Sequence, residues 1–173
     1  MDALKEYTIQ FTGLKDGSHE FRYELGDAFF QAASDEEIQG GEVLMTVQLD
    51  KSPTMLVAGM HARGTVRVHC DHCNGLMAFP IGGEQRQVFH LNGRTRFEED
   101  ADDVVGLDPD ESEVNLTHYF YECIRLSLPI RRVHPEGQCD PEVEKAMRSH
   151  EVEHEHVPDP RWAALNALKK KSR

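Results

Sequence analysis

The sequence predicts an α+β fold: an antiparallel sheet that can curl towards a barrel, with one amphipathic helix packed on it and a further helix at the C-terminus. Three observations support this prediction. Apolar and polar residues alternate in several short runs before residue 91, which is the period of strands. These runs do not alternate with helical segments as βαβ units would require. Residues 115–128 instead carry apolar side chains at helical spacing.

The first two strands are expected before a short helix. Residues 4–11 alternate weakly, and residues 19–25 alternate well. A short helix is expected over residues 28–33, after Gly26 and Asp27. The further strands are expected at residues 43–49, 55–61, 64–69, 76–81 and 85–91.

Turn residues predict how these strands are joined. Pro53 indicates a tight turn between residues 43–49 and 55–61, which gives a hairpin. Gly64 is expected to interrupt the chain and restart it as a strand that delivers Cys70. The pair Gly82-Gly83 is expected to form another hairpin turn. The result is an antiparallel meander.

The best predicted helix covers residues 115–128. Asn115 can cap its start, and Pro129 ends it. Cys123 falls on the apolar stripe of this helix, where a free cysteine behaves as a small hydrophobic side chain. We therefore do not count Cys123 as a metal ligand.

A single α+β domain is expected over residues 1–147, including a short helix that begins at Pro141. Residues 148–158 are rich in His and Glu and are predicted to be a charged linker. Residues 159–173 are predicted to be a helical tail, because Pro160 suits a first helical position and the segment ends in lysines.

Charge and hydropathy exclude several classes of protein. The chain has 31 acidic and 19 basic residues and a net charge of −12, which argues against a broad nucleic-acid surface. No apolar run is long enough to span a membrane, and no secretory signal is evident at the N-terminus. We therefore expect a cytoplasmic protein whose four cysteines are thiols or metal ligands.

Nine carboxylates crowd residues 98–113. Their spacing does not match a calcium-binding loop. The simplest interpretation is a solvated acidic loop. The alternative is an acidic face that meets a basic protein partner.

The most informative motif is the pair Cys70 and Cys73, which follows a predicted strand as a C-x-x-C knuckle. His134 and Cys139 bracket a Pro-Glu-Gly-Gln turn and can supply two further ligands from one loop. The four residues would make a closed Cys3His zinc site. The alternatives are distant reduced thiols with a surface histidine, or a site in which His69 or His72 replaces His134.

Nothing in the residues calls for an enzyme or indicates a small-molecule substrate. A thioredoxin-like use of the C-x-x-C is disfavoured, because Gly75 and Pro80 oppose the helix that should follow. The rival to a non-catalytic function is a thiol- or metal-dependent enzyme that uses Cys70 and Cys73. A third hypothesis is direct RNA contact through basic residues, namely Arg125, Arg131, Arg132 and residues 169–171.

Three segments together resemble one bacterial family. They are the G-x-V-x-V-x-C-x-x-C run of residues 64–73, the helix of residues 119–129 that leads to residues 134–139, and the D-P-R-W-A-A-L run of residues 159–165. In this order they are similar to the YceD-like family, the large ribosomal RNA subunit accumulation proteins, in a Bacteroidetes-type variant.

The resemblance implies a cytoplasmic accessory factor in large-subunit ribosome assembly, which supports accumulation of the large-subunit ribosomal RNA. It would act through a ribosomal protein or a large-subunit precursor particle, and residues 98–113 would meet the basic partner. The knuckle departs from the family pattern, because Asp71-His72 and Asn74 stand where many relatives have x-Arg and Leu around the second cysteine. Many relatives also have more cysteines after the helix, where only Cys139 remains here.

Overall fold

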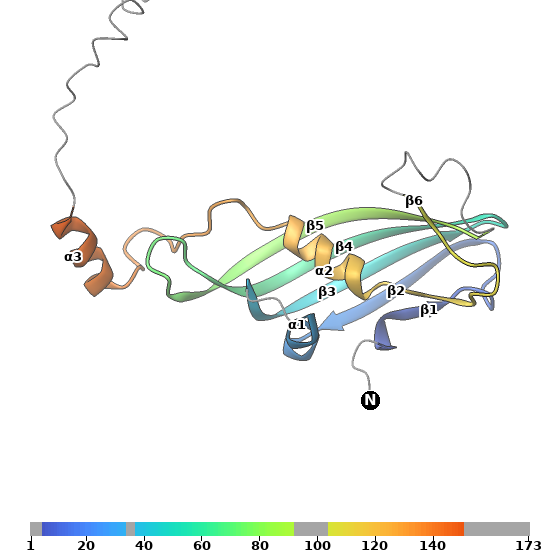
Figure 1. The fold of residues 1–173 in the computed structure, drawn as a ribbon, viewed down its shortest axis with the longest axis horizontal. Coiled ribbons are helices and arrows are strands. Elements are labelled where there is room, and N and C mark those ends of the chain that lie inside the picture. Colours follow the sequence, from blue (N-terminus) through green and yellow to red (C-terminus); the bar gives the residue numbers. More distant parts are fainter. Residues whose placement is uncertain (1–4, 34–36, 92–103, 151–173) are drawn as a thin grey trace, which may run out of the picture. The chain divides into compact units, whose positions relative to one another are not determined.

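The protein is described here by a computed structural model, which covers residues 5–33, 37–91 and 104–150 (Figure 1). The chain divides into two compact units, Met1–Cys139 and Asp140–Arg173. The predicted single domain to residue 147 remains a prediction. Most of the predicted linker and all of the predicted tail lie outside the described residues.

The first unit is built on a five-stranded sheet in the order β2-β3-β4-β5-β6. The strands are β2 (Gly17–Leu25), β3 (Ile38–Lys51), β4 (Met55–His69), β5 (Leu76–His90) and β6 (Val104–Gly106). The first four strands pair antiparallel in sequence order, so the predicted meander is confirmed. The sheet is not closed into a barrel, because in the described residues β2 and β6 do not pair with each other.

Two features at the ends of this unit differ from the prediction. The fifth strand, β6, lies inside the acidic stretch and pairs parallel to β5, with Val104 opposite Val88. The predicted strand of residues 4–11 is a 3-10 turn, η1 (Lys5–Tyr7), followed by the short strand β1 (Thr8–Gln10). Strand β1 pairs with β7 (Glu113–Asn115) as a separate two-stranded sheet.

The predicted breaks at Gly64 and at Gly82-Gly83 are wrong, because β4 and β5 each run through their glycines without interruption. Gly64 pairs with both Val43 and Ile81 in the middle of the sheet. A Cβ at Gly64 would collide with the backbone oxygen of Glu42. Gly64 therefore permits close approach of a neighbouring backbone rather than a change of chain direction.

The inner face of the sheet is apolar and is covered by two helices. Alternation places every second residue of each strand on this face, and in β3 these are Val43, Met45, Val47 and Leu49, all buried. Helix α1 (Asp27–Ala33) contacts β3, and helix α2 (Thr117–Leu126) contacts β4 and β5. An aromatic cluster joins them to η1, because the ring of Tyr7 packs edge-on against Phe29 and Phe120.

Helix α2 confirms the predicted helix, with ends two residues inside the expected range. The side chain of Asn115 accepts a hydrogen bond from the Thr117 N–H at 2.9 Å, so it satisfies one free donor of the first turn. Cys123 is 2% exposed, and Phe120 and Ile124 of the same helix are fully buried, so the predicted burial of Cys123 is confirmed. Burial raises the pKa of the Cys123 thiol, which suits an unreactive core residue.

The second unit begins with helix α3 (Pro141–Ser149), which confirms the short helix expected behind Pro141. The side chain of Asp140 caps it by accepting a hydrogen bond from the Glu142 N–H at 2.8 Å. No helix in the described ranges is both long and apolar enough to cross a membrane.

Gly83 is expected to be required where α2 crosses β5. A Cβ at this position would lie 2.7 Å from the Ser127 Cβ and 3.0 Å from the Cys123 carbonyl oxygen, both on or next to α2. Replacement of Gly83 by Ala should therefore lower the free energy of unfolding by about 1–3 kcal/mol, measured by urea denaturation. The neighbouring Gly82→Ala is the matched control, because a Cβ there meets no atom within 4 Å. Equal stability of the two variants would contradict the packing described here.

Candidate metal centre

The first half of the candidate site is the turn that joins β4 to β5. Cys70 immediately follows β4, and its N–H donates to the Gly75 carbonyl at 2.9 Å. The Asn74 N–H donates back to the Cys70 carbonyl at 2.8 Å. Asn74 has a φ of 58°, a left-handed conformation that asparagine tolerates better than most residues. The turn therefore holds Cys70 and Cys73, both buried, side by side at the end of the sheet.

The second half is the loop after α2. Within it, His134 and Cys139 lie on either side of a Pro-Glu-Gly-Gln turn, and both are half-buried. Between them the Gln138 N–H donates to the Pro135 carbonyl at 3.1 Å, which closes a tight turn. Gly137 has a φ of 79°, as the third residue of a type II turn requires. This turn reverses the chain so that the imidazole and the Cys139 thiol approach the same point.

The four predicted ligands, Cys70, Cys73, His134 and Cys139, lie together, with donor atoms all within 4.8 Å of one another. The Cys70 and Cys139 sulfurs are 3.9 Å apart. The His134 Nδ1 is 3.4 Å from the Cys73 sulfur and 3.8 Å from the Cys139 sulfur. A tetrahedron with zinc–sulfur bonds of about 2.3 Å and a zinc–nitrogen bond of about 2.0 Å has edges of about 3.6–3.8 Å. The group could therefore hold a metal ion with little movement of its side chains.

A pair of reciprocal hydrogen bonds joins the two halves of the site. The Asp71 N–H donates to the Arg132 carbonyl at 2.7 Å, and the Arg132 N–H donates to the Asp71 carboxylate at 2.6 Å. The Arg132 guanidinium also reaches Asp71, at 3.5 Å, and Glu37, at 2.6 Å. Glu37 in turn accepts from Arg125 of α2 at 3.0 Å. This network fixes the loop against the knuckle by contacts that do not involve the candidate ligands.

The site stabilises one thiolate but opposes a second. Burial alone would raise the pKa of Cys70, but the backbone N–H groups of Cys73, His134 and His72, with the Cys73 side chain, lower it to about 6. Desolvation and the neighbouring Cys73 and Cys70 thiols raise the pKa of Cys139 to about 12. A cation at the centre would remove this conflict, because a coordinating thiol is deprotonated.

Other residues considered from the sequence lie elsewhere or have other partners. The His69 imidazole bonds to the Asn74 carbonyl at 2.9 Å, and neither it nor His72 belongs to the group of four. The contact between Asp71 and Arg132 was not predicted from the sequence. Their only sequence signal is that they neighbour the candidate ligands.

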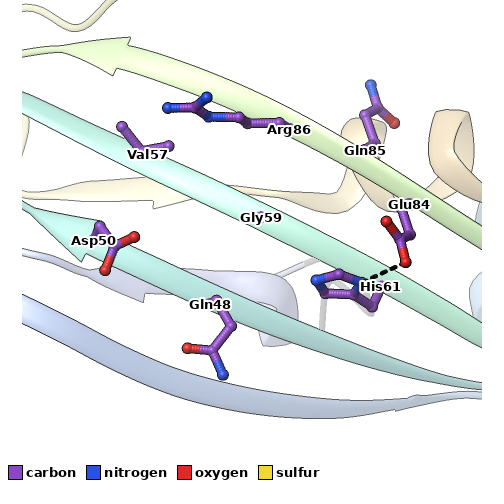
Figure 2. A pocket seen from close by; sticks show the side chains of 8 residues that line it. All are labelled: Gln48, Asp50, Val57, Gly59, His61, Glu84, Gln85 and Arg86. Atoms are coloured by element: carbon purple, nitrogen blue, oxygen red, sulfur yellow. Dashed lines mark ion pairs between the residues drawn. The ribbon is translucent and has the colours of Figure 1, made fainter.

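The opposite face of the sheet is open in the described residues and carries a shallow hollow of about 420 Å³ (Figure 2). It lies over β3, β4 and β5 at Gly59, where the absence of a side chain lowers the floor. The one ion pair drawn in it joins His61 to Glu84 at 3.5 Å. Its rim is of mixed charge, with Asp50 and Glu84 against Arg86, so it favours neither an anionic nor a cationic ligand.

The described part of the acidic stretch is anchored at both ends by strands. Its described part begins with strand β6, and near its end the backbone carbonyl of Ser112, just before β7, accepts from the Phe11 N–H at 3.1 Å. The Glu111 N–H donates to the Asp108 carbonyl at 2.9 Å, which makes a tight turn. The carboxylates of this segment are exposed: Asp108, Asp110, Glu111 and Glu113. Residues 98–103 lie outside the described residues.

A family model of the large ribosomal RNA subunit accumulation protein YceD matches residues 58–169, more than half of the chain. The chain therefore belongs to the YceD family, as its motifs predicted. All four candidate ligands and both helices α2 and α3 lie within the matched range. Neither a curated protein nor a solved structure matches the chain.

Asp71 is expected to be needed for tight metal binding although it is not a ligand. Replacement by Ala removes the carboxylate that holds the Arg132 backbone, and loss of such outer contacts typically weakens metal affinity by roughly 10–100-fold. Competition titration of zinc against a coloured chelator measures this loss. Glu136→Ala is the control, because Glu136 is exposed within the same loop and should leave affinity unchanged. Unchanged zinc affinity in Asp71→Ala would show that the hydrogen bonds between Asp71 and Arg132 do not preorganise the site.

Proposed function

We propose that this member of the YceD family is a non-catalytic, cytoplasmic accessory factor in assembly of the large ribosomal subunit. It would promote accumulation of the large-subunit ribosomal RNA by contacting a ribosomal protein or a precursor particle. The family match carries this proposal, since the family is named for that process. Two features of the molecule agree with a binding rather than a catalytic role. One is the closed geometry of the four-residue group, and the other is the acidic turn, residues 108–113.

The group of four favours a structural zinc ion. Three thiols and one imidazole are typical ligands of structural zinc sites, which are filled by four protein side chains. Catalytic zinc sites instead keep a position open for water or substrate. Zinc at this point would tie the end of the sheet to the loop after α2 and so stabilise the surface around both.

The rival hypothesis of a thiol-dependent enzyme has less support. In thioredoxin-like sites the C-x-x-C opens a helix, whose N-terminus stabilises the thiolate. Here the motif lies in a turn and leads into strand β5. Cys70 and Cys73 are only 2% and 8% exposed, so a substrate would have to displace part of the turn or loop to reach either sulfur.

Protein contact is favoured over direct RNA contact. Arg125 and Arg132, two of the basic residues considered for RNA, form ion pairs with Glu37. Their charges are therefore partly neutralised before any phosphate approaches. The chain carries a net charge of −12, and its acidic turn lies between strands β6 and β7. Clustered exposed carboxylates of this kind attract a basic partner and speed its association.

The acidic turn gives a direct test of the partner. We expect a triple variant, Asp108→Lys, Asp110→Lys and Glu113→Lys, to fold but to recover much less large-subunit precursor from cell extract in a pull-down. The loss should be largest at low salt, where the screening length is about 30 Å at 0.01 M. Glu111 is retained, because its carboxylate accepts from the Asp108 N–H at 3.1 Å and shapes the turn.

A matched control changes the net charge equally at another surface. Glu24, Glu42 and Asp50 are exposed on strands β2 and β3, and their reversal to Lys should leave recovery unchanged. Equal recovery by the wild type and the acidic-turn variant would eliminate this surface as the contact. Tight binding of naked ribosomal RNA fragments with a steep salt dependence would favour direct RNA contact instead.

A further inference from the structure

We infer that Cys70 and Cys139 form a reversible disulfide when the candidate metal centre is metal-free and meets hydrogen peroxide. The inference deepens the proposed function, because it assigns a second, oxidised state to the same residues. It rests on the geometry of the sulfurs. It would make the attachment of the loop to the sheet depend on the redox state of the cell as well as on zinc.

The distance between the two sulfurs is close to what a disulfide needs. They lie 3.9 Å apart, and the bond length is about 2.05 Å, so the two sulfurs must approach by roughly 1.9 Å in total. Rotation of the two cysteine side chains is the movement that would bring the sulfurs towards bonding distance. The hydrogen bonds between Asp71 and Arg132 hold the backbones of the two segments together, and they involve none of the four candidate ligands.

Cys73 is the competing partner for Cys139, because its side chain also contacts the Cys139 thiol. Its sulfur lies 3.4 Å from the His134 Nδ1, closer than the 3.8 Å between that nitrogen and the Cys139 sulfur, so the imidazole engages Cys73 more closely. The Cys70 sulfur does not engage the imidazole in this way. It accepts the His134 backbone N–H at 3.4 Å and lies 3.9 Å from the Cys139 sulfur. Cys123 is buried on α2 and is not part of the group of four.

The oxidation has two steps. Cys139 is half-buried, whereas Cys70 is 2% exposed, so peroxide reaches the pair from the side of Cys139. One of the two thiols is oxidised to a sulfenic acid, and one water is released as the peroxide O–O bond breaks. The other thiol then attacks the sulfenic acid sulfur, the S–O bond breaks, and the hydroxyl leaves as a second water. Two thiols and one hydrogen peroxide thus give one disulfide and two waters.

Zinc and the disulfide exclude each other. The disulfide removes two of the four candidate ligands, and a bound zinc ion would mask the same two thiolates from peroxide. Oxidation should therefore release zinc and replace one link between the loop and the knuckle by another. The covalent link would join residues 69 positions apart in the chain.

The test uses the full-length protein, stripped of metal by a chelator and treated with hydrogen peroxide. We expect the number of thiols titrated after denaturation to fall from four to two. Non-reducing peptide mass spectrometry should identify a Cys70–Cys139 disulfide, and dithiothreitol should restore all four thiols. The chain should remain a monomer on a non-reducing gel. Protein loaded with zinc beforehand should oxidise more slowly and release the ion to a coloured indicator.

Variants separate this disulfide from other products. The Cys73→Ser variant should still form the Cys70–Cys139 disulfide. The Cys139→Ser variant should keep all of its thiols after treatment with peroxide. A Cys70–Cys73 or Cys73–Cys139 disulfide, a disulfide between two chains, or sulfinic acids alone in the wild-type protein would overturn the inference. The proposed function fails separately, because it is tested by recovery of large-subunit precursor, which does not depend on whether the disulfide forms. The zinc site is also separate, since a chain that binds no zinc can still form the disulfide.

Discussion

The reciprocal hydrogen bonds between Asp71 and Arg132 are the contact on which the candidate metal centre depends. They join a turn at the end of β4 to a loop after α2, 61 residues further along the chain. Without them, two separate loops would have to be ordered by the metal alone, at a cost in chain entropy. With them, Cys70 and Cys73 face His134 and Cys139 at distances that suit a tetrahedral ion. Glu37 extends the contact to α2, because it pairs with both Arg132 and Arg125.

The sheet and its helix determine where that contact can form. Strands β4 and β5 pair over their whole length, so the turn between them is fixed at one end of the sheet. Helix α2 packs on the inner face at Gly83 and delivers the following loop towards the same end. The apolar core therefore positions the candidate ligands. It includes two of them, the buried Cys70 and Cys73. The acidic turn lies between two other strands, β6 and β7, so a partner could dock there without disturbing the ligands.

Much of this arrangement follows from local sequence pattern, and the rest does not. The alternation of β3 and the apolar stripe of α2 are local, so the strand, the helix and the burial of Cys123 could be predicted. Because Cys123 was not counted as a metal ligand, Cys139 was the one remaining cysteine that could join Cys70 and Cys73. Gly64 and Gly82-Gly83 were misread as breaks, because Gly64 and Gly83 approach neighbours that are distant in sequence and so leave no local signal. The contact of Asp71 with Arg132 and the parallel pairing of β6 have no local signature at all.

The central claim is that Cys70, Cys73, His134 and Cys139 together bind one zinc ion. X-ray absorption at the zinc edge, on purified protein with its metal content measured, tests this most directly. The account predicts one zinc per chain with three sulfur ligands at about 2.3 Å and one nitrogen ligand at about 2.0–2.1 Å. A substoichiometric metal content after loading with zinc, or a coordination shell dominated by oxygen, would contradict it.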